Sequence, residues 1–88
     1  MITPDQIIQT VRQYLLQTHL PGEDPANLTP TTELLSSGVL DSLATLELVS
    51  FIEQQYGIAL EAHEVDATNL GTLTAIATLV QAKLGARV

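Results

Sequence analysis

The sequence predicts an all-α fold, a small up-down bundle of three main helices plus one short helix, with a long loop between helices one and two. Two observations support this prediction. Three stretches place their apolar residues at the spacing of a helix face, and each begins at a capping residue and ends at a glycine or a proline-containing turn. The one strand-like stretch, 58–60, is too short to form a sheet. With 88 residues, the chain is expected to form a single domain, 1–88.

The first main helix is expected over residues 4–18. Thr3 and Gln6 are spaced as a capping box, and Pro4 stands at the first helical position. A helical stripe of apolar residues follows, namely Ile7, Ile8, Val11, Tyr14 and Leu15. Pro21 lies beyond the end of this helix, because proline lacks the backbone donor that a helix needs.

The 23 residues 19–41 form the long loop. A loop of this length in a compact domain is usually functional or held by buried anchors. We expect residues 29–33 to form a short helical turn and Gly38 to adopt a positive φ. The candidate anchors are the apolar residues of the loop, Leu28, Leu34, Leu35, Val39 and Leu40.

The second main helix is expected to begin at Asp41 or Ser42 and to end at Tyr56, before Gly57. Its apolar residues cover more than one face of the helix. A helix that is apolar most of the way round touches several neighbours, so we expect this one at the centre of the bundle.

The last main helix is expected to begin after Thr72, which caps it, and to end at Gly85. Lys83 in its last turn suits the negative end of the helix dipole. A single helical turn is expected before it, within residues 65–70. The apolar residues of the last helix follow helical spacing: Leu73, Ile76, Ala77, Val80 and Leu84.

Composition excludes several classes of function. Hydrophobic residues make up 45% of the chain, too much for an intrinsically disordered segment. The absence of cysteine excludes disulfide scaffolds, thiolate catalysis and thiolate zinc sites. Three Lys and Arg stand against ten Asp and Glu, a net charge of −7, which disfavours binding to nucleic acid and to anionic lipid. We expect protein partners with basic docking faces.

Neither a membrane segment nor an export signal is expected. Residues 1–5 lack the basic and apolar features of a signal peptide. The longest apolar stretch without charge, 67–82, is interrupted by polar residues and is shorter than the roughly 20 residues of a spanning helix. We expect a cytoplasmic monomer.

The junction between the long loop and the second helix carries the candidate chemistry. It reads Gly38-Val39-Leu40-Asp41-Ser42-Leu43. At a helix start, unpaired N–H groups and the positive end of the dipole favour an anion. A hydroxyl at this place is within reach of a modifying enzyme. Taken alone, Asp-Ser-Leu favours a simpler interpretation, in which Ser42 or Asp41 only caps the helix.

The whole segment resembles the phosphopantetheine attachment site of acyl and peptidyl carrier proteins. Asp41-Ser42-Leu43 follows Gly38 and precedes Glu47-Leu48-Val49, and the similarity continues through 53–58 and 69–73, so it covers essentially the whole chain. The resemblance implies a 4'-phosphopantetheine arm esterified to Ser42, with a terminal thiol that holds acyl or aminoacyl groups as thioesters. It makes Asp41 part of the signal that the phosphopantetheinyl transferase reads, and a carboxylate close to the metal which that reaction requires.

The resemblance also implies a docking surface on the second helix, with Leu43 exposed beside Ser42. Carriers of fatty-acid synthesis bear a densely acidic second helix, whereas Ala44, Gln54 and Gln55 are neutral here. Rim charges set partner choice, so this pattern favours free-standing aminoacyl or peptidyl carriers of natural-product pathways. Their partners are an adenylating ligase or acyltransferase that loads the arm, and tailoring or condensing enzymes that act in trans. The expected docking residues are Leu43, Leu46, Glu47, Val49 and Ser50.

Other functions remain as alternatives. The first alternative is a carrier of fatty-acid-type acyl chains. The second is an unmodified helical adaptor that binds proteins through its apolar second helix. A serine hydrolase is not expected, because the Gly-x-Ser-x-Gly motif is absent and neither histidine is placed as a base. His19 and His63 also lack the spacing of metal ligands, so we expect no metal site and no intrinsic catalysis.

Overall fold

A computed structural model of the chain describes residues 2–19, 22, 28–35 and 40–86. Over these ranges the regular structure is helical and includes no strand. This confirms the predicted bundle of three main helices and a short one. The elements are α1 (Pro4–Thr18), α2 (Ser42–Tyr56), the 3₁₀ helix η2 (Ala62–Glu64), α3 (Ala67–Leu70) and α4 (Leu73–Ala86).

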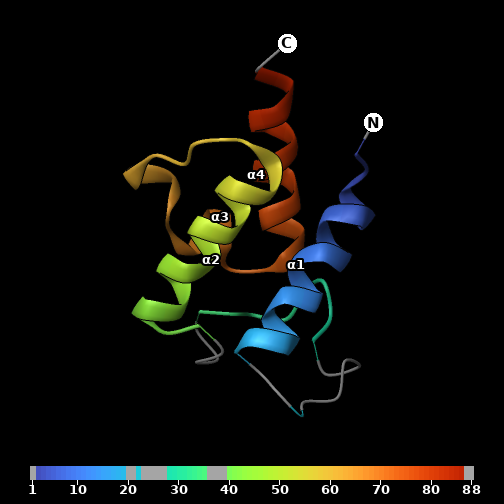
Figure 1. Cartoon of the computed structure of the whole chain (residues 1–88), viewed down its shortest axis with the longest axis vertical. Coiled ribbons are helices and arrows are strands. Elements are labelled where there is room, and N and C mark those ends of the chain that lie inside the picture. The colour runs from blue at the N-terminus through green and yellow to red at the C-terminus, as the bar shows by residue number, and fades with distance from the viewer. Residues whose placement is uncertain (1, 20–21, 23–27, 36–39, 87–88) are drawn as a thin grey trace.

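The three main helices do not simply alternate in direction (Figure 1). α1 runs down from the amino terminus, and α2 runs back up, antiparallel to α1. η2 and α3 then return the chain to the lower end of the bundle, so that α4 rises in the same direction as α2. Within the described ranges, none of the helices has both the length and the apolar character needed to cross a membrane.

The core is built from aliphatic side chains. The predicted stripe of α1 is buried at Ile7, Ile8, Val11 and Leu15. The loop anchors Leu28, Leu34 and Leu40 are buried as expected, and Leu35 packs half-buried against the core. Among the residues for which burial is given, no polar or charged side chain is fully buried. Gly38 and Val39 lie outside the described residues.

Backbone hydrogen bonds fix the loop against the helices. Residues 29–33 contain a single turn, in which the N–H of Thr32 donates to the carbonyl of Thr29 at 3.1 Å, and no helix forms there. The carbonyl of Pro30 accepts from the N–H of Thr74 in the first turn of α4, also at 3.1 Å. The loop is therefore attached to the start of α4 as well as to the core.

The expectation that α2 lies at the centre of the bundle is wrong. α4 occupies that place, in contact with α1, α2 and α3. The buried residues of α2 are confined to one face, at Ala44, Leu48 and Ile52, whereas Leu43 is 67% exposed and Leu46 is 62% exposed. Hydrophobic periodicity does not distinguish a face that packs on the core from one that is exposed to solvent, and α2 carries apolar residues on both.

The helix ends follow the capping signals with one exception. Gly57 ends α2 in the left-handed conformation with φ of 65°, where glycine has no steric penalty. The hydroxyl of Thr72 accepts from the N–H of Ala75 at 3.0 Å and caps α4, as predicted. Gly85 does not stop α4, which continues to Ala86. An isolated glycine lowers helix stability by only about 1 kcal/mol and does not by itself end a helix.

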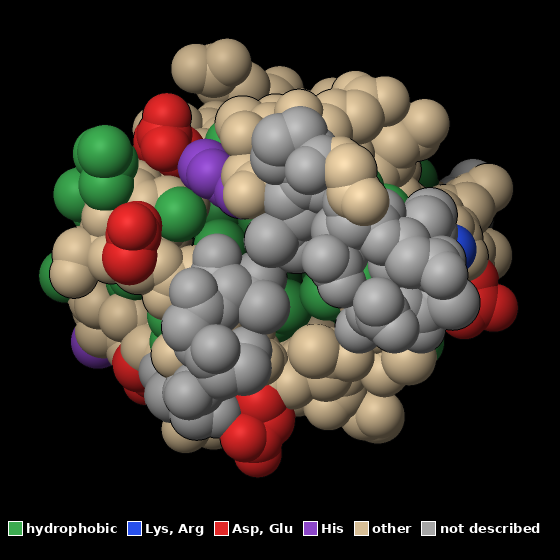
Figure 2. Space-filling model, turned by 90° about the horizontal axis from the view of Figure 1, so that it is seen from below, with side chains coloured by type: hydrophobic (Ala, Val, Ile, Leu, Met, Phe, Trp, Pro, Cys, Tyr) green, Lys and Arg blue, Asp and Glu red, His purple; other side chains and the backbone are tan. Residues whose placement is uncertain are grey.

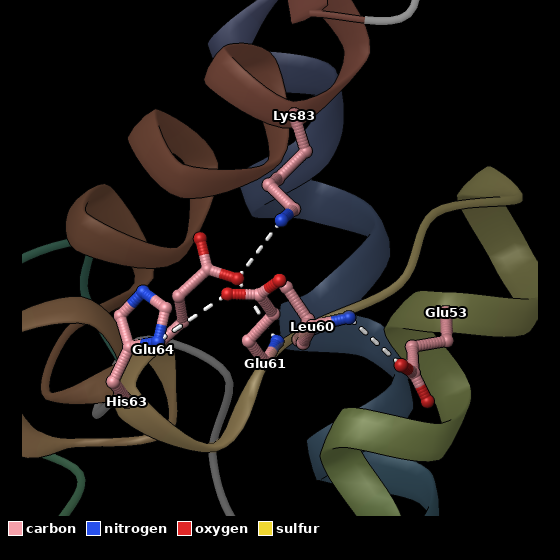
Figure 3. A network of polar contacts seen from close by, with 6 residues as sticks. All are labelled: Glu53, Leu60, Glu61, His63, Glu64 and Lys83. Carbon is pink, nitrogen blue, oxygen red and sulfur yellow. Dashed lines mark hydrogen bonds and ion pairs between the residues drawn. The ribbon is translucent and has the colours of Figure 1, made fainter.

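Carboxylates hold the segment between α2 and α3, which includes the 3₁₀ helix that was not predicted (Figure 3). Glu53 of α2 accepts a hydrogen bond from the N–H of Leu60 at 2.8 Å. The Glu64 carboxylate accepts from the N–H of Glu61 and from Lys83 of α4, both at 2.9 Å. These contacts tie the segment between α2 and α3 to both α2 and α4.

Candidate functional site

Asp41, and not Ser42, is the N-cap of α2. Asp41 is extended, with φ of −90° and ψ of −174°, and its carboxylate accepts from the N–H of Ala44 at 2.7 Å. Its backbone carbonyl accepts from the N–H of Thr45 at 2.9 Å. The interpretation of Ser42 as the helix cap is therefore wrong. Asp41 caps the helix, and its part in recognition by a transferase stays a prediction.

Ser42 is the first residue of α2, and its side chain is exposed. Its hydroxyl has no hydrogen-bond partner among the described residues, neither histidine included. The first N–H groups of a helix have no intrahelical acceptor, and they carry the positive end of the dipole. An anion joined to this hydroxyl would lie in a favourable field, and an enzyme can approach the hydroxyl from solvent.

Backbone hydrogen bonds of the long loop hold the residues that precede Ser42. Leu40 is buried, and its N–H donates to the carbonyl of Leu34 at 2.9 Å. The N–H of Leu34 donates in turn to the carbonyl of Gly71 at 2.7 Å. These bonds connect the residues before Ser42 to the junction of α3 and α4.

The face of α2 that follows Ser42 is apolar and acidic. Leu43, Leu46, Glu47 and Ser50 are exposed, whereas Val49 is half-buried and packs against the core. Four of the five expected docking residues thus lie open to solvent. Figure 2 shows hydrophobic side chains gathered at the left edge of the molecule, the side on which α2 begins, with carboxylates beside them. α2 carries no lysine or arginine.

A shallow groove of about 440 Å³ lies between α1 and α2. The rings of Tyr14 and Phe51 stack inside it, with centroids 4.1 Å apart and planes inclined by 13°. Sequence patterning placed Tyr14 in the apolar stripe of its helix but did not indicate that it meets Phe51. We call this the α1–α2 groove; its lining residues are Tyr14, Leu46, Glu47, Ser50, Phe51 and Gln54.

His19 borders this groove, which the sequence did not indicate. Its ring meets Tyr14 edge-on, with centroids 5.6 Å apart, and its Nε2 lies 4.0 Å from the carboxylate of Glu47. Nε2 is buried and makes no hydrogen bond to any residue that the structure describes. Burial raises the pKa of the Tyr14 hydroxyl, and the nearby charge of Glu47 raises it further.

A second cluster, on η2, has the residue types of a metal site. Ligand atoms of Glu61, His63 and Glu64 lie within 4.8 Å of one another. The Glu64 carboxylate is, however, already bound by the N–H of Glu61 and by Lys83, and these two contacts, the backbone one first, lower its pKa. The cluster therefore joins η2 to α4. The side chains of Glu61 and His63 are exposed, and Nδ1 of His63 lies 3.4 Å from the Glu61 carboxylate.

A family model described as "Phosphopantetheine attachment site" matches residues 5–85, which include Asp41, Ser42 and all of α2, η2 and α3. A search of curated proteins found no match.

Proposed function

The chain belongs to the phosphopantetheine attachment family, and we propose that Ser42 is the residue that bears its covalent 4'-phosphopantetheine. The observation that carries this proposal is the exposed hydroxyl at the first position of α2, left without a hydrogen-bond partner in the described chain because Asp41 supplies the cap. The arm supplies a terminal thiol on which a carboxylic acid is held as a thioester. The chain is thus a carrier, and partner enzymes perform the chemistry on its cargo.

The residues around Ser42 have distinct parts in this function. The first N–H groups of α2 stabilise the negative phosphodiester formed at the hydroxyl. Asp41 holds the first turn of the helix and presents one edge of its carboxylate to the transferase. Because Leu40 is buried and hydrogen-bonded to Leu34, partners meet the attachment point in one orientation.

Partners dock on the exposed face of α2 through Leu43, Leu46, Glu47 and Ser50, with Val49 beneath them. Two large exposed leucines provide apolar contacts, and Glu47 selects a basic or polar edge on the partner. The helix has two glutamates and no basic residue, so its docking depends less on charge than a densely acidic helix would. This supports loading by an adenylating ligase or acyltransferase of a natural-product pathway.

Transfer of the arm from coenzyme A to the chain, which we call conversion, tests the attachment. Incubation with coenzyme A, Mg²⁺ and a promiscuous phosphopantetheinyl transferase should raise the intact mass by that of one arm. The adaptor alternative predicts an unchanged mass together with cofactor-independent binding to one partner. A fluorophosphonate probe should not label the chain, since Ser42 has no base hydrogen-bonded to it in the described residues.

The nature of the cargo has its own test. We propose an amino acid or another small carboxylic acid, because Ala44, Gln54 and Gln55 leave the second helix without the charges typical of fatty-acid carriers. The converted chain is offered in parallel to amino-acid ligases and to a malonyl transferase of fatty-acid synthesis. Efficient loading by the malonyl transferase alone would contradict this proposal and favour the fatty-acid alternative.

A further inference from the structure

His19 is a largely buried side chain that has no part in the proposed attachment. It reaches from the end of α1 towards α2, and its side chain is only 13% exposed. Its ring packs edge-on against Tyr14, and its Nε2 makes no hydrogen bond to any described residue. A buried polar atom without a partner destabilises a fold, so a group that can pair with Nε2 is expected within reach.

The carboxylate of Glu47 is the group that this nitrogen faces. Nε2 of His19 lies 4.0 Å from Oε1 of Glu47. The Glu47 side chain is 50% exposed, so a movement of about 1 Å brings its carboxylate to the length of a charge-assisted hydrogen bond. Arg12 and Lys83 bond to other side chains. Among the described residues, His19 is thus the one group within 4.0 Å of Glu47 that can become a cation.

We propose that His19 is a positioning residue for Glu47, which it holds and neutralises when its ring is protonated. The ring takes a proton from water, and its Nε2–H then donates to the Glu47 carboxylate. The positive charge of the ring strengthens this hydrogen bond and cancels the negative charge of Glu47. Imidazole changes its charge between about pH 5 and 8, so the pair forms at the acidic end of this range.

The pair changes what the proposed docking face presents to a partner. Among the described residues that line the α1–α2 groove, Glu47 is the one with a charge, and it directly follows the exposed Leu46. When His19 is neutral, the carboxylate of Glu47 is free to meet a basic edge of the partner. When His19 is protonated, that carboxylate is held and its charge is cancelled. The carrier therefore docks a basic partner more slowly as the pH falls, a consequence that rests on the proposed docking face.

The other described groups at the groove keep their charge in this range of pH. The Tyr14 hydroxyl faces the same place, and burial, followed by the charge of Glu47, raises its pKa. This hydroxyl therefore stays uncharged between about pH 5 and 8. The remaining residues that line the groove carry no ionisable side chain. His19 is thus the described group through which acidity acts on this surface.

Titration of the unconverted protein by nuclear magnetic resonance tests the pair. The side-chain carboxyl carbon of Glu47 should shift in a step between about pH 5 and 8, above the range in which a carboxylate itself titrates. His19→Phe keeps a ring against Tyr14 but cannot donate, so the step should vanish in this variant. Glu53 is the matched control on the same helix, because its carboxylate accepts from the N–H of Leu60, and it should show no step. No step at Glu47, or one that persists in His19→Phe, overturns the pair.

Rates of conversion test the effect on docking. We expect the kcat/KM of the transferase for the wild type, divided by that for His19→Phe, to fall about fivefold between about pH 8 and about pH 5.5. The division removes the pH dependence of the transferase itself. His63→Phe is the control, because the side chain of His63 is 75% exposed beside Glu61, and its profile should follow that of the wild type.

The outcomes keep this inference apart from the proposed attachment at Ser42. A step at Glu47 with a constant ratio of kcat/KM overturns the effect on docking and leaves the attachment standing. No gain in mass at any pH overturns the attachment, and the titration of Glu47 still decides the pair. A step that is lost in His19→Phe, together with a falling ratio, supports the inference.

Discussion

The carboxylate of Asp41 accepts a hydrogen bond from the backbone N–H of Ala44 at 2.7 Å, and this contact leaves the hydroxyl of Ser42 outside the cap of α2. Serine and aspartate are comparable as N-caps, so either of the two adjacent residues could have had this role. Since Asp41 takes it, the Ser42 hydroxyl can be esterified without loss of a hydrogen bond that the helix needs. Capping belongs to Asp41, and the proposed attachment belongs to its neighbour Ser42.

This division predicts unequal costs for two alanine substitutions. Asp41→Ala removes the cap and should lower the free energy of unfolding by about 1 kcal/mol. Ser42→Ala removes an exposed hydroxyl and should change it by less than about 0.5 kcal/mol. Urea denaturation of the unconverted proteins measures both. A larger loss for Ser42→Ala than for Asp41→Ala would contradict the assignment of the cap.

Asp41→Asn separates capping from recognition by the transferase. Asparagine caps helices as well as aspartate does, so the variant should unfold within about 0.5 kcal/mol of the wild type. If the transferase reads the charge of Asp41, its kcat/KM for the variant falls by about tenfold, which corresponds to roughly 1.4 kcal/mol. An unchanged kcat/KM would show that Asp41 acts only as a cap.

Leu46 and Leu48 are expected to respond in opposite ways. Leu48 is fully buried, so Leu48→Ala should cost about 3 kcal/mol of unfolding free energy. Leu46 is 62% exposed, so Leu46→Ala should leave stability within about 0.5 kcal/mol. It should instead lower kcat/KM for loading of the converted protein by about tenfold, as loss of a central interface contact does. Unaltered loading would remove Leu46 from the docking face.

Glu64 should make stability depend on acidity. Its pKa is lowered from 4.5, first by the N–H of Glu61 and then by Lys83, so the folded chain holds this proton less tightly than the unfolded chain. The stabilisation is complete at pH values above the pKa that Glu64 has in the unfolded chain. It is lost as the pH falls through the lowered pKa of the folded chain. Between about pH 6 and about pH 3, the wild type should therefore lose more unfolding free energy than Glu64→Gln. Parallel curves for the two proteins would contradict this role.

The helix bounds could be predicted because local residues set them. Thr3 with Gln6, Asp41, Gly57 and Thr72 act within one turn of their own positions, so their effect is visible in a short stretch of sequence. The 3₁₀ helix was missed because its capping pair, Glu61 and Glu64, lacks the Ser or Thr that usually marks such a box. At Gly85 a stop was predicted where the helix continues.

The exposed place of Ser42 at the start of α2 could be predicted, whereas the groove could not. Ser42 is identified by its neighbours in sequence, and its exposure follows from its place at the start of a helix. Tyr14 and Phe51 are 37 positions apart and meet only because α1 and α2 run antiparallel. The exposure of Leu43 was expected from its family counterpart. The apolar residues around α2, taken alone, wrongly placed this helix at the centre of the bundle.

Locating the added mass tests the central claim most directly. The wild type, Ser42→Ala and Ser50→Ala are each treated with coenzyme A, Mg²⁺ and the transferase, then weighed intact and fragmented. Ser50 is the matched control, because it is an exposed serine two turns further along α2. We expect the wild type and Ser50→Ala to gain one arm at residue 42, and Ser42→Ala to gain none. An equal gain in Ser42→Ala, or an arm found on any other residue, would contradict the account.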